Sequence, residues 1–177
     1  MFVQKYNTPK QYSNLFMSSD GIYLTGLWFE NSKDAMKHLS NLIIKNLPIF
    51  EETKKWLDIY FSGSNPSFTP LFKIENITSF RKQVLDLLLE IPYGNVVSYN
   101  DIAKKIAVQN GLNKMSAQAV GGAVGWNPIC LIIPCHRVID SNGNLTGYGG
   151  GMKNKIELLK LEKNNMESFI IPCTEEN

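Results

Sequence analysis

The stretch FRKQVLDLLLEIPYGNVVSYNDIAKKI, residues 80–106, decides the fold of the C-terminal part of this chain. Its first half carries apolar residues at helical spacing, Thr78 or Ser79 can cap that helix, and the pattern stops before the Pro-Tyr-Gly that follows. Its second half begins at Ser98, with Asp101 placed as the partner in a capping box. The stretch therefore predicts two short helices joined by a tight turn.

A third short helix is predicted over SAQAVGGAVGW, residues 116–126, and it should end before Pro128. Three short helices with tight connections are typical of a helix-turn-helix or winged arrangement. The third helix is rich in glycine, and each glycine inside a helix costs about 1 kcal/mol relative to alanine. Two explanations stay open. The helix either packs closely against another helix, the commoner case, or approaches a ligand such as the DNA minor groove, which is about 6 Å wide.

The N-terminal part predicts a strand followed by helices. GIYLTGLWF, residues 21–29, is rich in β-branched and aromatic residues and is bounded by turn residues. Residues 32–46 show helical spacing behind a serine cap, and EETKKWLDIYFSG, residues 51–63, repeats the pattern up to its final glycine. Residues 62–72, with glycine, serine, asparagine and two prolines, are the best candidate for a linker.

Composition places few limits on function. The chain has 177 residues, of which 44% are hydrophobic and 19% charged, as in an ordinary globular protein. It contains no run of about 18 apolar residues, and its start, MFVQKYNTPKQYSN, lacks the apolar core of a secretory signal, so we expect a cytoplasmic protein that does not span a membrane. Because the net charge is only +2, any nucleic-acid-binding surface must be built from locally arranged basic groups.

The three cysteines, Cys130, Cys135 and Cys173, form no CxxC pair, and only His38 and His136 could join them around a metal. We therefore expect no zinc site and reduced thiols. Cys130 and Cys173 have no polar neighbour suited to thiolate chemistry, so we interpret both as buried structural residues. His38, on a predicted helix beside a lysine, is interpreted as a solvated surface residue.

The stretch LIIPCHRVID, residues 131–140, sets Cys135 among chemically active neighbours. The apolar residues before it favour an interior strand and a buried thiol, whereas His136 and Arg137 are of the types that lower the cost of a thiolate. Adjacent strand residues point to opposite faces, so contact between cysteine and imidazole needs a turn, for which Pro134 is suited, or a bridging water. A structural salt bridge is at least as good an explanation of the arginine as catalysis. Spacing leaves the carboxylate that orients the imidazole open among Asp101, Asp140, Glu157 and Glu162.

The motifs around this cysteine resemble those of one family. PCHRV at residues 134–138, preceded by NP at 127–128 and AVGGAV at 119–124, closely resembles the O6-alkylguanine-DNA alkyltransferases, also called methylated-DNA–protein-cysteine methyltransferases. FRKQVLDLLLEIPYGNVVSYNDIA, residues 80–103, and GYGGGMKNKIELLKLE, residues 147–162, are similar to two further stretches of that family's C-terminal domain.

This resemblance covers residues 78–163 strongly and the N-terminal part weakly. It implies an N-terminal α/β domain of ribonuclease-H-like fold over residues 1–75 and a mainly α, winged-helix-like C-terminal domain with a helix-turn-helix over residues 76–177. The implied activity is DNA repair by irreversible, stoichiometric transfer of the alkyl group from O6-alkylguanine to a cysteine. The implied partner is double-stranded DNA, with O4-alkylthymine left open as a second substrate. We expect a monomer with no cofactor and no metal.

The resemblance also implies roles for individual residues. Cys135 would be the alkyl acceptor, His136 the base acting through a water, and Glu162 the carboxylate that orients the imidazole. Tyr99 would donate a proton toward the guanine and help rotate the target phosphate, and Asn127 would brace the turn. The implied DNA-contacting set is Ser116, Ala117, Gln118, Ala119 and Gly122 with Tyr99 and Arg137, and the implied substrate pocket is Tyr148, Gly149 and Gly150.

Two positions depart from the family pattern or are unusual for their place. Gln118 stands where the family commonly has an arginine, which predicts weaker DNA affinity or slower repair. Trp126 is large for its place and either stacks on the sugar-phosphate backbone or packs inside the protein. The N-terminal part also lacks cysteines, so the zinc ligands of some relatives are missing here.

Three other functions fit the sequence less well. A non-catalytic damage sensor of the alkyltransferase-like type would replace the cysteine, a winged-helix transcription factor leaves PCHRV unexplained, and a cysteine hydrolase needs an oxyanion hole that nothing in the sequence indicates. In the favoured interpretation the product is a thioether, which offers no carbonyl for water to attack. We therefore expect one alkyl group per protein molecule, without turnover.

Overall fold

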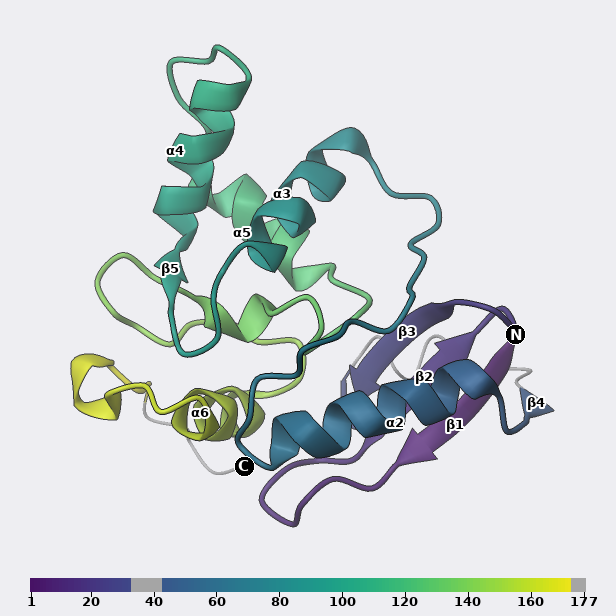
Figure 1. The fold of residues 1–177 in the computed structure, drawn as a ribbon. Coiled ribbons are helices and arrows are strands. Elements are labelled where there is room, and N and C mark those ends of the chain that lie inside the picture. Colours follow the sequence, from purple (N-terminus) through teal and green to yellow (C-terminus); the bar gives the residue numbers. More distant parts are fainter. Residues whose placement is uncertain (33–42, 173–177) are drawn as a thin grey trace.

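A four-stranded mixed sheet forms the N-terminal part of the molecule. The computed structural model describes residues 1–32 and 43–172. The strands are β1 (Phe2–Tyr6), β2 (Leu15–Ser19), β3 (Leu24–Phe29) and β4 (Ile43–Ile44), in the order β3-β2-β1-β4. Both pairings among β1, β2 and β3 are antiparallel, and β4 runs parallel to β1. Helix α2 (Pro48–Phe61) lies along one face of this sheet (Figure 1).

The outer edge of β3 receives two later segments of the chain. Leu24 donates its backbone N–H to the carbonyl of Leu71 at 2.9 Å, so the end of the predicted linker is paired with the strand. Leu27 donates to Pro128 and accepts from Cys130, both at 2.9 Å. The sheet therefore directly anchors the segment that leads into Cys135.

The C-terminal part contains the three predicted helices. They are α3 (Ser79–Leu89), α4 (Tyr99–Gln109) and α5 (Ala117–Gly125), and they contact one another above the sheet (Figure 1). Thr78 caps α3, and Ser98 with Asp101 forms the complete capping box of α4, as the sequence predicted. After them come the 3-10 turn η1 (Cys135–Arg137), α6 (Met152–Leu161) and η2 (Met166–Ser168), while β5 (Val97–Ser98) pairs in parallel with β6 (Val138–Ile139).

Two predictions of secondary structure differ from the structure. The helix expected over residues 32–46 lies mostly outside the described residues, and its described end forms strand β4 instead, because Ile43 and Ile44 pair with β1. The apolar residues before Cys135 are interior, as expected, but they form turns rather than a strand. The φ of Leu131 is 69°, in the left-handed region that a strand does not use, and Pro134 carries no N–H for a ladder.

One hydrophobic core joins the two parts of the chain. Leu27 of β3, Phe50 of α2, Leu88 of α3 and Leu158 of α6 are fully buried in the same cluster of side chains. This shared core holds α6 and η1 against the sheet, so the residues of the site below come from both parts of the chain. Within the described residues, no helix combines the length and the hydropathy needed to cross a membrane.

Candidate active site

The turn that carries Cys135 is braced by one asparagine. The side-chain amide of Asn127 donates to the carbonyl of Ile133 at 2.8 Å and to the sulfur of Cys135 at 3.1 Å, and its oxygen accepts from the N–H of Ile129 at 3.0 Å. Asn127 is buried, so these bonds are shielded from water. The sulfur is therefore held in one position at the start of η1.

The pKa of the Cys135 thiol is lowered. A hydrogen bond from the side chain of Cys130 is the main cause, burial opposes it, and the Asn127 amide and the charge of Lys155 lower it further. Cys130 is buried, as predicted, but it is not without a polar neighbour, because it lines the same small cavity as Cys135 and its hydrogen bond lowers the pKa of that thiol. Cys173 and His38 lie outside the described residues.

Lys155 is a functional candidate that the sequence analysis missed. Its side chain is fully buried, and its ammonium donates to the carbonyls of Val138 at 2.7 Å and Thr146 at 3.0 Å. Burial lowers its pKa to about 8, although the charge of Cys135 acts in the opposite direction. The sequence did contain a clue to Lys155. It precedes Glu162 by seven residues, or two helical turns, so the two side chains lie on the same face of the helix.

His136 is paired with Glu162 rather than with the other three candidate carboxylates. Its Nε2 lies 2.8 Å from Oε1 of Glu162, and both side chains are fully buried. Burial lowers the pKa of His136, so the imidazole is neutral at neutral pH. Since a carboxylate only accepts, Nε2 carries the proton and Nδ1 keeps its lone pair. Nδ1 is buried and has no hydrogen-bond partner among the described residues, which leaves it available as a base.

Arg137 lies inside the protein. Its Nε and NH2 nitrogens donate to the two oxygens of Glu162, each at 2.9 Å, and NH1 donates to the carbonyl of Ile91 at 2.7 Å. Burial alone would raise the pKa of Glu162, but the hydrogen bonds and charges of His136 and Arg137 hold it well below its ordinary value. Because the guanidinium is buried and engaged in these bonds, Arg137 forms a structural salt bridge and is not free to contact DNA, contrary to the expectation.

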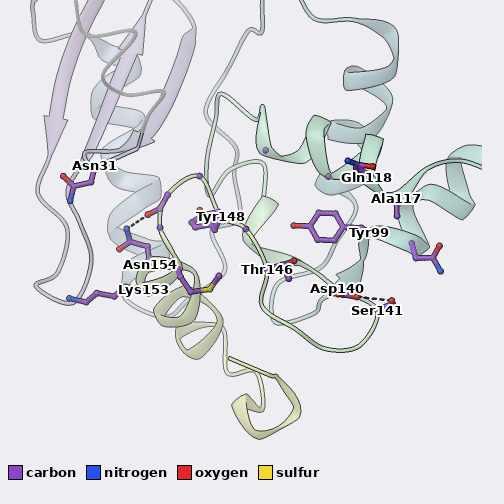
Figure 2. A pocket seen from close by; sticks show the side chains of 18 of the residues that line it. Asn31, Tyr99, Ala117, Gln118, Asp140, Ser141, Thr146, Tyr148, Lys153 and Asn154 are labelled. Carbon is purple, nitrogen blue, oxygen red and sulfur yellow. Dashed lines mark hydrogen bonds between the residues drawn. The ribbon is translucent and has the colours of Figure 1, made fainter. Parts of the chain in front are cut away.

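An open cleft of about 1110 Å³ lies next to this site. One wall comes from the helices, with Tyr99, Ala117 and Gln118, and Tyr148 lies across from Tyr99 (Figure 2). The loop residues Gly149 and Gly150, which follow Tyr148, also line the cleft. The same loop also lines the small cavity that contains Cys135, Cys130 and Asn127. The predicted substrate-pocket residues therefore stand between the cleft and the sulfur. Burial raises the pKa of Tyr99 and, more strongly, that of Tyr148, so both hydroxyls stay protonated.

The exposed face of α5 is not packed against another helix. A Cβ added at Gly122 or Gly125 would meet no atom within 4 Å, and one at Gly121 would meet only the ring of Tyr99 at 3.8 Å. Gln118 and Ala119 are exposed on the same short helix, and Ser116 caps its N-terminus by accepting from the N–H of Ala119. Internal packing therefore does not explain the glycines at positions 122 and 125.

Trp126, at the end of α5, is partly buried and packs inside the protein. The guanidinium of Arg81 lies over its ring at 4.4 Å from the centroid. This contact favours the packing alternative raised for Trp126. Among the described residues, no three histidine, cysteine, aspartate or glutamate side chains are grouped so that they could hold a metal ion.

A buried thiol of lowered pKa and an imidazole–carboxylate pair lie beside a cleft that is lined in part by short helices, an arrangement that suits a protein with a reactive cysteine. Residues 79–164 match the family model described as 6-O-methylguanine DNA methyltransferase, DNA binding domain. The chain is 35% identical to a methylated-DNA–protein-cysteine methyltransferase of Haemophilus influenzae over 158 residues, which cover 88% of this chain and 83% of the relative. An inducible methylated-DNA–protein-cysteine methyltransferase of Bacillus subtilis is 36% identical, with 94% of this chain and 98% of that protein covered.

A solved structure agrees with these relatives. The Mycobacterium tuberculosis OGT in complex with DNA superimposes with a TM-score of 0.78 at 34% identity, over 92% of this chain and 93% of that one. The chain belongs to the methylated-DNA–protein-cysteine methyltransferase family.

Proposed function

We propose that this protein repairs DNA by transferring the alkyl group of O6-alkylguanine to the sulfur of Cys135, once per molecule. The observation that carries the proposal is the sulfur itself, which has a lowered pKa and lies behind a substrate-sized cleft next to a helix whose exposed face is built of small residues. The family membership and the DNA complex of a relative support the same activity.

The proposed reaction is an in-line displacement at the alkyl carbon. His136, with Nδ1 as the base, takes the thiol proton through one water, and the thiolate attacks the carbon attached to O6. The carbon–oxygen bond breaks, its electron pair stays on the guanine, and the guanine gains a proton at its ring nitrogen. The products are unmodified guanine and an S-alkyl cysteine, a thioether that water does not hydrolyse.

The leaving base needs donors, and Tyr99 and Gly149 are proposed to supply them. The hydroxyl of Tyr99 stays protonated and lines the cleft, which suits a proton donor toward the guanine ring. The backbone N–H of Gly149, in the opposite wall, is proposed to donate to the guanine oxygen as charge develops there. Tyr148, Gly149 and Gly150 would thus form the edge of the alkyl pocket.

The target base must leave the duplex to reach the sulfur. Extruding it costs a few kcal/mol, and less for a weakly paired damaged base, which favours the lesion over normal guanine. We propose that α5 enters the minor groove through Ser116, Ala117, Gln118, Ala119 and Gly122, with Gln118 occupying the place of the extruded base. Two observations support this docking: an added Cβ at Gly122 would meet no protein atom within 4 Å, and Gln118 is exposed.

We further propose that the two parts of the chain are domains, residues 1–75 with a ribonuclease-H-like sheet and residues 76–177 with a winged-helix-like arrangement. The antiparallel β1–β2–β3 order, the α3–α4–α5 cluster and the short β5–β6 pair support this description. The structures of relatives support the mixed sheet and the helices in general terms.

The test is the rate of label transfer from duplex DNA that carries labelled O6-methylguanine. The unmodified protein should acquire the label in a single exponential phase that ends at one label per molecule, and Cys135→Ser should acquire none. A benzylguanine probe distinguishes the rivals, because a hydrolase would instead cleave a generic ester and a pure binding protein would do neither. Transfer by Cys135→Ser at the unmodified rate would overturn the proposal.

A further inference from the structure

A tyrosine from the N-terminal part of the chain lies at the junction of the imidazole and the carboxylate. Tyr60, in the last turn of α2, is fully buried. Its hydroxyl donates to Oε1 of Glu162 at 2.7 Å, and its oxygen lies 3.2 Å from Nε2 of His136. None of the roles described above for the reaction uses this side chain.

The ring of Tyr60 is held by aromatic contacts on several sides. It stacks on Trp56, with ring centroids 5.3 Å apart and an angle of 7° between the planes. It also makes edge-to-face contacts with Tyr93 and His136, whose ring centroids lie 6.1 Å and 6.4 Å from its own. A ring fixed in this way keeps its hydroxyl in one place without further support. The hydroxyl of Tyr60 is therefore a fixed hydrogen-bonding group beside the carboxylate of Glu162 and the imidazole of His136.

The direction of each proton follows from the acceptors present. Glu162 only accepts, so the hydroxyl proton of Tyr60 is directed to Oε1, and the free lone pairs of its oxygen face Nε2–H of His136. Burial, followed by the charge and hydrogen bond of Glu162, raises the pKa of Tyr60 well above its ordinary value, so it remains a donor. Nε2–H is thus held between two oxygens, which keeps Nδ1 free of its proton and fixes the plane of the ring.

We infer that Tyr60 is a positioning residue for alkyl transfer: its hydroxyl fixes the carboxylate of Glu162 and the imidazole of His136 in the orientation that presents Nδ1 toward the acceptor. The inference rests on the proposed function. It also means that the reactive site is completed by α2, from outside residues 79–164 that the family model matches.

The first experiment compares Tyr60→Phe with the unmodified protein in the label-transfer assay across pH. The variant keeps the ring and loses the hydroxyl, so transfer at pH 7 should be about tenfold slower, as expected for a lost hydrogen bond to a charged group. Without the hydroxyl, Oε1 of Glu162 loses one hydrogen-bond donor. Its negative charge then stabilises the protonated imidazole more strongly, so the pKa of His136 rises. The acidic limb of the pH profile should therefore move to higher pH, and the loss of rate should be smaller at pH 9.

Other charged groups around the imidazole also affect the pKa of His136. Glu162 raises the basicity of His136, while Arg137 and Lys155 lower it. These three are unchanged in Tyr60→Phe, so a shift of the acidic limb reports on the missing hydroxyl. A matched control is Tyr12→Phe, because the ring of Tyr12 packs on Phe61, which also contacts Tyr60, but its hydroxyl donates to the backbone carbonyl of Glu157 at 3.1 Å. This control should keep the unmodified rate and profile.

A double-mutant cycle with Glu162→Gln separates positioning from a general structural effect. If Tyr60 acts through Glu162, Tyr60→Phe should slow transfer much less in the Glu162→Gln background than alone. An equal loss in both backgrounds, the same at every pH, would overturn the inference, and so would an unchanged rate and profile in Tyr60→Phe.

A measurement on the intact protein keeps the inference testable if Tyr60→Phe fails to fold. In ¹⁵N and ¹H NMR spectra of the unmodified protein, with the two histidines assigned through His38→Gln, His136 should carry its proton on Nε2, and a slowly exchanging tyrosine hydroxyl should show contact with that ring. A rapidly exchanging hydroxyl with no such contact would overturn the inference. If the unmodified protein transfers no label, the proposed function is wrong. The NMR spectra test the arrangement of Tyr60 and His136 separately, because they do not depend on alkyl transfer.

Discussion

The reactivity of Cys135 depends on a few buried polar side chains. Cys130 and Asn127 donate to its sulfur, and Lys155 supplies a positive charge close by. Each contact favours the thiolate over the thiol, and together they outweigh burial, which favours the thiol. An interior that is mostly apolar thus holds a nucleophile that ionises more readily than an ordinary cysteine.

Lys155 provides the clearest test at this scale. Lys155→Met removes the charge and leaves the carbonyls of Val138 and Thr146 without their donor. The pKa of Cys135 should rise, transfer at pH 7 should fall about tenfold and recover toward higher pH, and unfolding should require about 1–3 kcal/mol less. Lys160→Met is the control, since Lys160 lies on the same helix in an exposed pair with Glu157. A pH-independent loss in Lys155→Met would exclude the charge effect.

At the scale of the element, α5 shows why a short helix carries several glycines. Gly122 is exposed, and its missing side chain would touch nothing in the free protein. A helix gains about 1 kcal/mol when such a glycine becomes alanine, so the glycine costs stability in the absence of DNA. This cost agrees with the proposal that α5 enters the narrow minor groove of DNA.

A small and a large side chain at position 122 should affect DNA binding differently. Gly122→Ala should raise the thermal midpoint slightly and bind duplex DNA nearly as well as the unmodified protein. Gly122→Leu should keep the fold and react at the unmodified rate with a free benzylguanine probe, yet bind DNA at least tenfold more weakly. DNA affinity measured by fluorescence anisotropy checks both variants. Tight DNA binding by Gly122→Leu would show that this face of α5 is not the docking surface.

At the scale of the whole molecule, the site also links stability to pH. The folded-state pKa of His136 lies below its ordinary value of 6.5, so the unfolded chain binds a proton that the folded protein excludes. Glu162 likewise has a folded-state pKa below its ordinary 4.5. Both groups therefore contribute stability that is present at neutral pH and is lost as the pH falls, first below about 6.5 and then below about 4.5.

Thermal melts at a series of pH values check this linkage. The midpoint should fall from pH 6 downward, as the contributions of His136 and then Glu162 are lost. In His136→Gln, the fall between pH 6.5 and 5 should be shallower, because the group that titrates there has been removed, while His38→Gln should keep the unmodified slope. A midpoint of His136→Gln that falls as steeply as that of the unmodified protein would contradict the linkage.

Local patterns predicted the helical region well because its signals are local. Thr78, Ser98 and Asp101 cap their own helices, so a single stretch of sequence contains both donor and acceptor. Ile43 and Ile44 were misassigned to a helix because only a distant partner, β1, makes them a strand. A local pattern cannot show such a partner.

The sequence predicted only those site residues that belong to a recognisable motif. Cys135, His136 and Asn127 lie within or beside PCHRV, whereas Tyr60 and Cys130 reach the site through contacts that no spacing rule reveals. Glu162 could not be ranked above three other carboxylates by spacing alone, and its identity rested on the resemblance until the geometry placed it 2.8 Å from the imidazole. The resemblance placed Arg137 among the expected DNA contacts, and only the fold shows that its side chain is buried.

The most direct test of the account is the mass of the protein after incubation with excess duplex DNA that contains O6-methylguanine. We predict that every molecule gains one methyl group in place of one hydrogen, that peptide mapping places it on the sulfur of Cys135, and that longer incubation adds no more. Unmodified protein that continues to remove methyl groups, or a methyl group found on another residue, would contradict the central claim.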